Sequence, residues 1–239
     1  MVTAAELMQE LDVLADPQSA DHAQRFFKTA PGQYGEGDIF LGISVPVTRK
    51  VATKFRQLSL DQLEILLESP IHEHRLTAVI IMTEQAKRAA PEQQKALYDL
   101  YLRRTDRLNN WDIIDVSCRQ VVGEYLMDKP RQPLYQLATS KNFWERRIAI
   151  VSTWQFIRAG QLQDTFAIAA LLLTDTHDLI HKATGWMLRE AGKRDQAQLK
   201  DFLDHHAGTM PRTALRYALE RFSSADKAYY MNRQNFGVQ

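Results

Sequence analysis

The stretch WDIID at residues 111–115 has four counterparts in this 239-residue chain, each opening on a basic residue. The five stretches begin 36, 36, 35 and 30 positions apart. The counterparts are RLTAV at 75–79, RIAIV at 147–151, KATGW at 182–186 and RTALR at 212–216. Each interval leaves room for one further helix, and a helix pair repeated at this length is typical of an α-solenoid. Because no tetratricopeptide consensus is readable, the pattern favours the HEAT-like class.

The chain around these stretches predicts the remaining helices. The expected partner helices of the repeats lie at 92–103, 134–139, 162–173 and 197–206. The spacing of Leu7, Leu11 and Leu14 marks a first helix, and Phe26 and Phe27 lie in a second. We expect one all-α domain over 1–239, with N-terminal helices and a Gly-rich loop at 1–46, helical repeats at 47–222 and a C-terminal tail at 223–239.

The composition excludes several classes of protein. Hydrophobic residues make up 45% and charged residues 25% of the chain, which is typical of a folded globular domain. A single cysteine excludes an intramolecular disulfide and a zinc site built on several thiolates. The longest apolar run, 166–173, is too short to cross a bilayer, and the N-terminus lacks the pattern of a signal peptide. We therefore expect a cytoplasmic protein without a membrane span.

Charge is distributed unevenly along the chain. The formal net charge is only +1. Residues 1–140 contain 16 Lys and Arg against 19 Asp and Glu, whereas residues 141–239 contain 14 against 10. The C-terminal half can therefore present an anion-binding face, although an uneven spread of solvated charges explains the same counts.

Equivalent positions of successive repeats line up on one surface, and residues i and i+4 of each aligned helix share a face. The first column contains Arg75, Trp111, Arg147, Lys182 and Arg212. The second contains Val79, Asp115, Val151, Trp186 and Arg216. A buried column would be aliphatic, so these columns predict an exposed surface, and basic side chains beside indoles suit a phosphate backbone. The expected fold is an α-solenoid of HEAT-like helical repeats with a concave DNA-binding face.

Asp115 is the single carboxylate among these cations. It would repel phosphate in a pure nucleic-acid cradle, so it requires a role of its own. One interpretation is a structural ion pair with Arg147 on the neighbouring helix. The other is a chemical role for the carboxylate, and the spacing alone favours neither.

Longer motifs support a more specific interpretation. They are Tyr34-Gly-Glu-Gly-Asp38, Phe40-Leu-Gly42, Val45-Pro46, Arg49-Lys50, Asn110-Trp-Asp-Ile-Ile-Asp115, Phe143-Trp-Glu-Arg-Arg147-Ile-Ala, Lys182-Ala-Thr-Gly-Trp186-Met-Leu-Arg189-Glu190 and Met210-Pro-Arg212-Thr-Ala-Leu-Arg216-Tyr217-Ala. With these motifs, over nearly its whole length, the chain resembles the AlkD-type alkylpurine DNA glycosylases, the HEAT-like DNA alkylation repair family.

The resemblance implies roles for individual residues. Asp115 matches the catalytic carboxylate of the family, Trp111 and Trp186 match its two active-site indoles, and Arg147 matches an arginine beside them that contacts the DNA backbone. One position departs from the pattern, because Asn110 stands where some members have a second tryptophan. The substrate range of this chain is therefore left open.

The implied activity is that of a monofunctional DNA glycosylase, which removes cationic N3- or N7-alkylated purines from double-stranded DNA in base excision repair. The resemblance favours a monomer, and we expect no cofactor and no metal. Further candidates for contacts to the DNA backbone are Lys182, Arg189, Arg212 and Arg216, with Lys193 and Arg194 behind them. The alternative is a non-catalytic HEAT-like module that binds DNA or a protein partner, in which Asp115 is structural.

Other chemically active residues point to packing. Cys118 follows Asp115 by three residues without a nearby histidine, so we expect a packing role. Neither His72/His74 nor His205/His206 has the spacing of a helical zinc site. Trp144 and Trp154 fall outside the columns and are expected in the core or at repeat edges.

Overall fold

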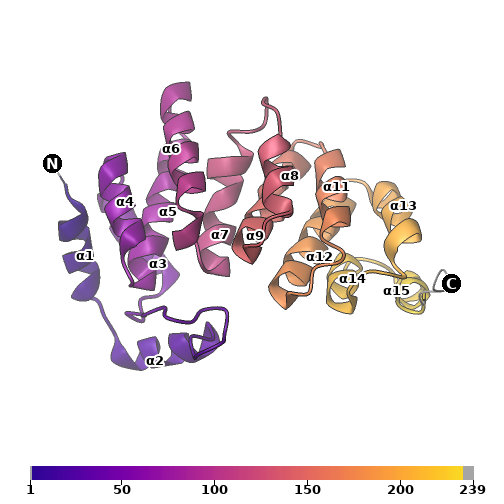
Figure 1. The fold of residues 1–239 in the computed structure, drawn as a ribbon, viewed down its shortest axis with the longest axis horizontal. Coiled ribbons are helices and arrows are strands. Elements are labelled where there is room, and N and C mark those ends of the chain that lie inside the picture. Colours follow the sequence, from indigo (N-terminus) through magenta and orange to yellow (C-terminus); the bar gives the residue numbers. More distant parts are fainter. Residues whose placement is uncertain (1, 234–239) are drawn as a thin grey trace. The chain divides into compact units, whose positions relative to one another are not determined.

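The computed structural model describes residues 2–233, which form helices and no β-strand (Figure 1). One isolated parallel bridge joins Ile39, in the expected Gly-rich loop, to Ile71, which directly precedes the helix at His72–Ala86. The chain divides into two compact units, Met1–Tyr125 and Leu126–Gln239. The predicted all-α class is confirmed. None of the helices in residues 2–233 is both long and apolar enough to cross a bilayer.

The first unit is built around α5, which is buried along most of its length. Its helices are α1 (Ala4–Asp12), α2 (Pro17–Phe26), α3 (Val45–Lys54), α4 (Leu60–Glu68), α5 (His72–Ala86), α6 (Pro91–Arg103), the 3-10 turn η1 (Thr105–Arg107), α7 (Trp111–Cys118) and the π-helical turn η2 (Arg119–Gly123). Helices α3, α4, α6 and α7 all pack on α5. A helix surrounded in this way needs partners for every charged group it carries, because an unpaired buried charge is costly.

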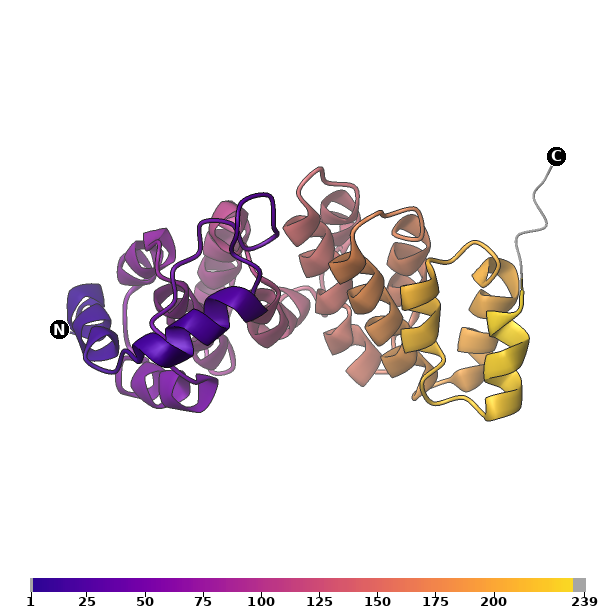
Figure 2. The same cartoon turned by 90° about the horizontal axis from the view of Figure 1, so that it is seen from below.

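Helix α2 lies across the ends of the other helices of the first unit. Figure 1 shows it below them, and Figure 2, turned by 90°, shows it in front of them. Asp16 is the N-cap of this helix, and its Oδ1 accepts hydrogen bonds from the N–H groups of Gln18 and Ser19 at 3.0 and 3.2 Å. The loop that follows α2 returns toward the start of α5, where His72 N–H donates to the Ile39 carbonyl at 2.8 Å.

The second unit repeats a helix pair. Its helices are α8 (Gln132–Ala138), α9 (Phe143–Ser152), α10 (Trp154–Arg158), α11 (Gln163–Leu171), α12 (Asp178–Gly192), α13 (Gln196–His206), α14 (Arg212–Ala218) and α15 (Ser224–Met231). Helix α12 packs on α9 and α14 within one row, and α11 and α13 pack against it from the other row. This arrangement is that of successive HEAT-like pairs.

The expected partner helices correspond to α6, α8, α11 and α13, and the five aligned stretches lie in α5, α7, α9, α12 and α14. The predicted repeat is therefore confirmed at the level of its helices. Helix α15 lies within the expected C-terminal tail, of which 234–239 are outside the described residues. The expectation of a single domain over 1–239 stays a prediction.

Candidate functional site

Helix α7 carries Trp111 at its first position and Asp115 one turn later, so the two side chains share a face. Asn110 precedes the helix in an extended conformation, and its Oδ1 accepts a hydrogen bond from the Trp111 N–H at 2.8 Å. Both Trp111 and Asp115 are half-buried. The start of α7 therefore presents an indole and a carboxylate together on the first unit.

The C-terminal end of α7 is fixed to α6. The hydroxyls of Ser117 and Tyr101 are hydrogen-bonded at 2.8 Å, and the Ser117 hydroxyl also lies 2.6 Å from the Ile113 carbonyl. Tyr101 is fully buried, and this burial raises the pKa of its phenol well above the usual value. The phenol therefore stays neutral, and α7 is held near its last residue as well as at its start.

Three aromatic residues from the N-terminal segment support the Trp111 indole. The Phe27 ring stacks on it at a centroid distance of 5.2 Å, and the Phe26 ring meets it edge-on at 6.0 Å. The indole N–H donates to the Tyr34 hydroxyl at 3.3 Å. Phe26 is 57% exposed. From local sequence these residues are expected only in a helix and a motif, because nothing in their spacing relates them to a residue some 80 positions away.

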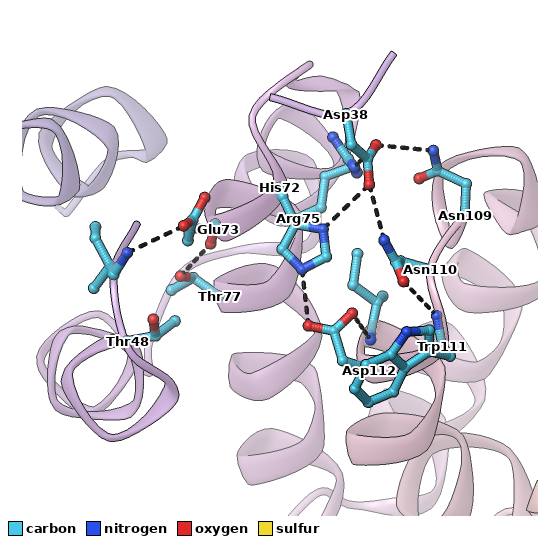
Figure 3. Close-up of polar contacts among 12 residues, drawn as sticks. Asp38, Thr48, His72, Glu73, Arg75, Thr77, Asn109, Asn110, Trp111 and Asp112 are labelled. Atoms are coloured by element: carbon cyan, nitrogen blue, oxygen red, sulfur yellow. Dashed lines mark hydrogen bonds and ion pairs between the residues drawn. The ribbon is translucent and has the colours of Figure 1, made fainter. Parts of the chain in front are cut away.

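Asp38 is the centre of a buried polar network at the start of α7 (Figure 3). Its Oδ1 accepts hydrogen bonds from Arg75 Nη2 at 2.5 Å and Asn109 Nδ2 at 3.1 Å. Its Oδ2 accepts one from Asn110 Nδ2 at 3.1 Å. Asn110, the residue that departs from the family pattern, therefore caps α7 with its Oδ1 and donates a hydrogen bond to Asp38 with its Nδ2. A tryptophan in its place could supply neither contact with the same geometry.

The predicted exposed column is wrong at several positions. Arg75 is 1% exposed and Arg147 is 5% exposed, while Val79 and Val151 are fully buried. Arg75 is internal because Asp38, 37 positions earlier in the chain, is folded against it. A column of cations indicates a surface only when no acceptor from another segment reaches it, and the repeat spacing contains no information about such acceptors.

His72, the first residue of α5, joins two buried carboxylates. Its Nε2 lies 2.8 Å from Asp112 Oδ2, and its Nδ1 lies 3.3 Å from Asp38 Oδ2 (Figure 3). Burial lowers the pKa of His72, but the charges and hydrogen bonds of Asp112 and Asp38 outweigh this effect and raise it to about 9. The imidazole is therefore protonated at neutral pH. Asp112 Oδ1 also accepts from the N–H of Ile113, within α7 itself.

Glu73 fixes the loop that supplies Asp38. Its carboxylate accepts hydrogen bonds from three successive N–H groups, those of Leu41 at 2.9 Å, Gly42 at 2.8 Å and Ile43 at 3.2 Å. Gly42 has φ +81°, and a Cβ there would lie 2.4 Å from backbone atoms at the start of α2. Only glycine fits this position. The side chains of α5 therefore hold the loop and, through it, the aromatic support of Trp111.

In the second unit, α9 and α12 carry Arg147 and Trp186. Arg147 Nη1 donates to the Leu179 carbonyl on α12 at 2.6 Å, which ties the two helices together. Trp186 is half-buried and meets Trp154 edge-on at 5.1 Å. The structure thus brings Arg147 and Trp186 onto two packed helices of one unit, as Trp111 and Asp115 are brought onto one helix of the other.

Gly185 allows the close helix packing that positions its neighbour Trp186. A Cβ at this glycine would be 2.3 Å from the Ala214 carbonyl oxygen and 2.6 Å from Tyr217 Cβ, both on α14. Helices α12 and α14 therefore pack with their backbones close together, and this contact sets the position of Trp186 on α12.

The four predicted contacts to the DNA backbone differ in their surroundings. Arg212 and Arg216 are exposed on α14. Lys182 is ion-paired with Asp178 at 2.8 Å. Arg189 is only 19% exposed and is held by Glu190 and Glu220. Contact with DNA stays a prediction for all four residues, and it requires Arg189 to exchange a carboxylate for a phosphate.

Two packing predictions are confirmed, since Cys118 and Trp144 are both buried. Trp154 is half-buried and meets Trp186 edge-on. Among the residues that the structure describes, no group of three or more His, Cys, Asp or Glu side chains could hold a metal ion. The roles of Asp115, Trp111, Trp186 and Arg147 stay predictions.

Comparison with known proteins agrees with this fold. A solved structure described as a predicted DNA alkylation repair enzyme from Enterococcus faecalis matches with a TM-score of 0.69 and 17% identity, covering 88% of this chain and 97% of that one. A search of curated proteins found no match. The model of a protein family described as DNA alkylation repair enzyme matches residues 7–222. This chain therefore belongs to the DNA alkylation repair enzyme family.

Proposed function

We propose that this protein is a monofunctional DNA glycosylase that hydrolyses the N-glycosidic bond of cationic N3- or N7-alkylated purines in duplex DNA. The observation that supports this proposal best is the pairing of Trp111 with Asp115, half-buried and one turn apart on α7. An indole face can bind the cationic base, and a carboxylate can stabilise the positive charge that develops on the sugar when the base leaves. Membership of the DNA alkylation repair enzyme family supports alkylated DNA as the substrate.

The chemistry requires little from the protein. Alkylation at N3 or N7 places a positive charge on the base, so the base leaves with the electron pair of its bond to C1′ and becomes neutral. The sugar then carries oxocarbenium-like charge, which the Asp115 carboxylate stabilises electrostatically. Water adds to C1′, and its proton passes to Asp115 and then to solvent. No strong general acid is needed.

The aromatic residues provide selectivity for the charged base. The face of an indole attracts a cation by roughly 0.5–2 kcal/mol per contact, and a neutral base gains none of this. Trp111 is held for that purpose by Phe27 and Tyr34, and Trp186 is set by the α12–α14 contact. Arg147 remains a candidate for a phosphate contact, which requires its guanidinium to leave the buried position where it bonds the Leu179 carbonyl. Arg212 and Arg216 are exposed and can bind the DNA backbone directly.

The test is release of free base from methylated duplex DNA, measured by chromatography and mass spectrometry under single-turnover conditions. The native protein should release N3-methyladenine or N7-methylguanine, and Asp115→Asn should release none while binding the DNA as tightly as the native protein. Asp99→Asn is the matched control, since Asp99 is an exposed carboxylate ion-paired with Lys95 on α6. This control should retain full activity.

Each other outcome changes the proposal. Release by both the native protein and Asp115→Asn would keep the enzyme and reject the catalytic residue. Release by neither, with DNA binding intact, would support the non-catalytic DNA-binding module instead. Trp111→Leu should reduce excision more than it reduces general DNA affinity, and equal losses would contradict its contact with the lesion.

A further inference from the structure

The network around His72 contains two carboxylates and two cations. Asp38 and Asp112 provide the negative charges, Arg75 and the imidazolium of His72 the positive ones, and all four side chains are at most 11% exposed. Neutral His72 would leave this interior with one unbalanced negative charge, which is costly. A neutral imidazole can also donate to only one of its two carboxylates.

Two separate sets of contacts connect His72 to Trp111. The first is polar: Nε2 bonds Asp112, which follows Trp111 directly in α7. The second is aromatic. The His72 ring stacks on Phe40 at 4.4 Å, Phe40 stacks on Phe27 at 4.9 Å, and Phe27 stacks on Trp111 at 5.2 Å. A change at His72 therefore reaches both the backbone and the indole face of Trp111.

We infer that the imidazolium of His72 is a positioning residue, which fixes the orientation of the Trp111 indole and the start of the helix that carries Asp115. The inference rests on the proposed function only for the consequence that this orientation matters for excision. His72 touches no reacting atom. It acts through Asp112 and through the rings of Phe40 and Phe27.

The charged groups near His72 come from every element packed around it. Asp38 lies in the loop before α3 and Asp112 on α7. On α5 itself, Arg75 bonds Asp38, and Glu73 is occupied by the N–H groups of the loop. Arg107 of η1 acts electrostatically on Arg75 and donates to carbonyls at the end of α4. His72 itself, with its pKa raised to about 9, gains or loses its proton between pH 7 and 10.

The test follows Trp111 directly by 19F NMR of protein labelled with 5-fluorotryptophan, titrated from pH 7 to 10. Trp111→Phe assigns its resonance among the four tryptophans. In the native protein this resonance should shift with a midpoint at about pH 9, while that of Trp144, in the second unit, should not. In His72→Gln the transition should disappear, and at pH 7 the Trp111 resonance should already be displaced.

His74→Gln is the matched control. His74 is equally buried on α5, but its ring bonds Ser69 and lies 3.5 Å from Asp12 of α1 rather than near α7. The Trp111 transition should be unchanged in this variant. Asp112→Asn serves as a second probe that keeps the histidine. It removes the partner that raises the pKa of His72 most, so the midpoint should move to lower pH.

A Trp111 resonance that does not titrate in the native protein, or one that titrates alike in His72→Gln, would overturn the inference. A second readout is excision itself: His72→Gln should slow single-turnover base release about 10- to 100-fold at pH 7, as expected for a misplaced group, with DNA affinity unchanged. The NMR result does not depend on excision. Loss of the proposed function would therefore leave a titrating Trp111, whereas failure of the inference would leave an active enzyme with an unresponsive Trp111.

Discussion

The guanidinium of Arg75 donates to the carboxylate of Asp38 at 2.5 Å, and Arg75 is 1% exposed and Asp38 6% exposed. Arg75 Nη1 also donates to the Ser69 carbonyl at 2.8 Å. This pair joins the loop before α3 to the central helix of the first unit. Burial raises the pKa of Asp38, but the His72 hydrogen bond and the Arg75 charge outweigh that effect, and the net shift is downward. The carboxylate is therefore ionised at neutral pH.

Removing one member of this pair should be strongly destabilising. Arg75→Met leaves a buried carboxylate short of one cation, and we expect the free energy of unfolding to fall by about 3–5 kcal/mol in urea denaturation. Arg103→Met is the comparison, because the Arg103 side chain is 58% exposed in its ion pair with Glu64. It should cost less than about 1 kcal/mol. Equal losses would show that Arg75 is not paired in the interior.

Glu73→Gln tests the anchor of the loop. The Leu41 N–H donates to Glu73 Oε2, and those of Gly42 and Ile43 donate to Oε1. An amide has one acceptor oxygen, so its NH₂ group faces the N–H donors of the oxygen that it replaces. We expect a loss of about 2–3 kcal/mol in the free energy of unfolding and faster proteolysis between residues 28 and 43. Glu92→Gln, at an exposed site in the first turn of α6, should change neither.

The stability of the fold should depend on pH through His72. Its pKa is raised from 6.5 to about 9, since Asp112 and Asp38 outweigh burial. The resulting stabilisation is complete below pH 6.5, decreases once the unfolded chain deprotonates, and is lost as the pH rises through 9. Urea denaturation should show the free energy of unfolding falling across this window by up to about 1.4 kcal/mol per pH unit. The slope should be smaller in His72→Gln, and parallel curves would contradict the assignment.

Two glycines of α12 should respond differently to alanine. At Gly185 the new Cβ meets the backbone of α14, so the helices must separate, and we expect a loss of about 1–3 kcal/mol. At Gly192 the nearest atom is Leu199 Cδ2, the far end of a flexible side chain, and the gain in helix propensity offsets the contact. Thermal unfolding of the two variants measures the difference. A smaller loss for Gly185→Ala than for Gly192→Ala would refute the close approach of α12 to α14.

The exposed arginines of α14 should act through counterion release. Arg212→Gln and Arg216→Gln should each reduce the slope of log K against log salt by about 0.9, measured by fluorescence anisotropy on duplex DNA. The loss of affinity should be the same for methylated and unmethylated duplexes, because a phosphate contact carries no information about the base. Lys87→Gln, an exposed lysine ion-paired with Glu84 in the first unit, should leave the slope unchanged. A slope that does not respond to the two arginines removes them from the interface.

Much of the architecture could be predicted from local sequence. The repeat spacing located the stretches that became α5, α7, α9, α12 and α14, because helix formation depends on neighbours three and four positions apart. The motifs around Asn110 and Trp186 predicted the family. The burial of Cys118 and Trp144 was also predictable, since neither residue belongs to the two columns of repeat positions that were expected at the surface.

The sequence by itself therefore determined the helices, their repeat and the face shared by Trp111 and Asp115. Only the tertiary structure decided that Arg75 is internal, that His72 is held between two carboxylates, and that Phe26 and Phe27 support Trp111. The reason is physical. Whether a charged side chain lies inside a protein depends on the partner that meets it there, and Asp38 reaches Arg75 across 37 positions that no helical period relates.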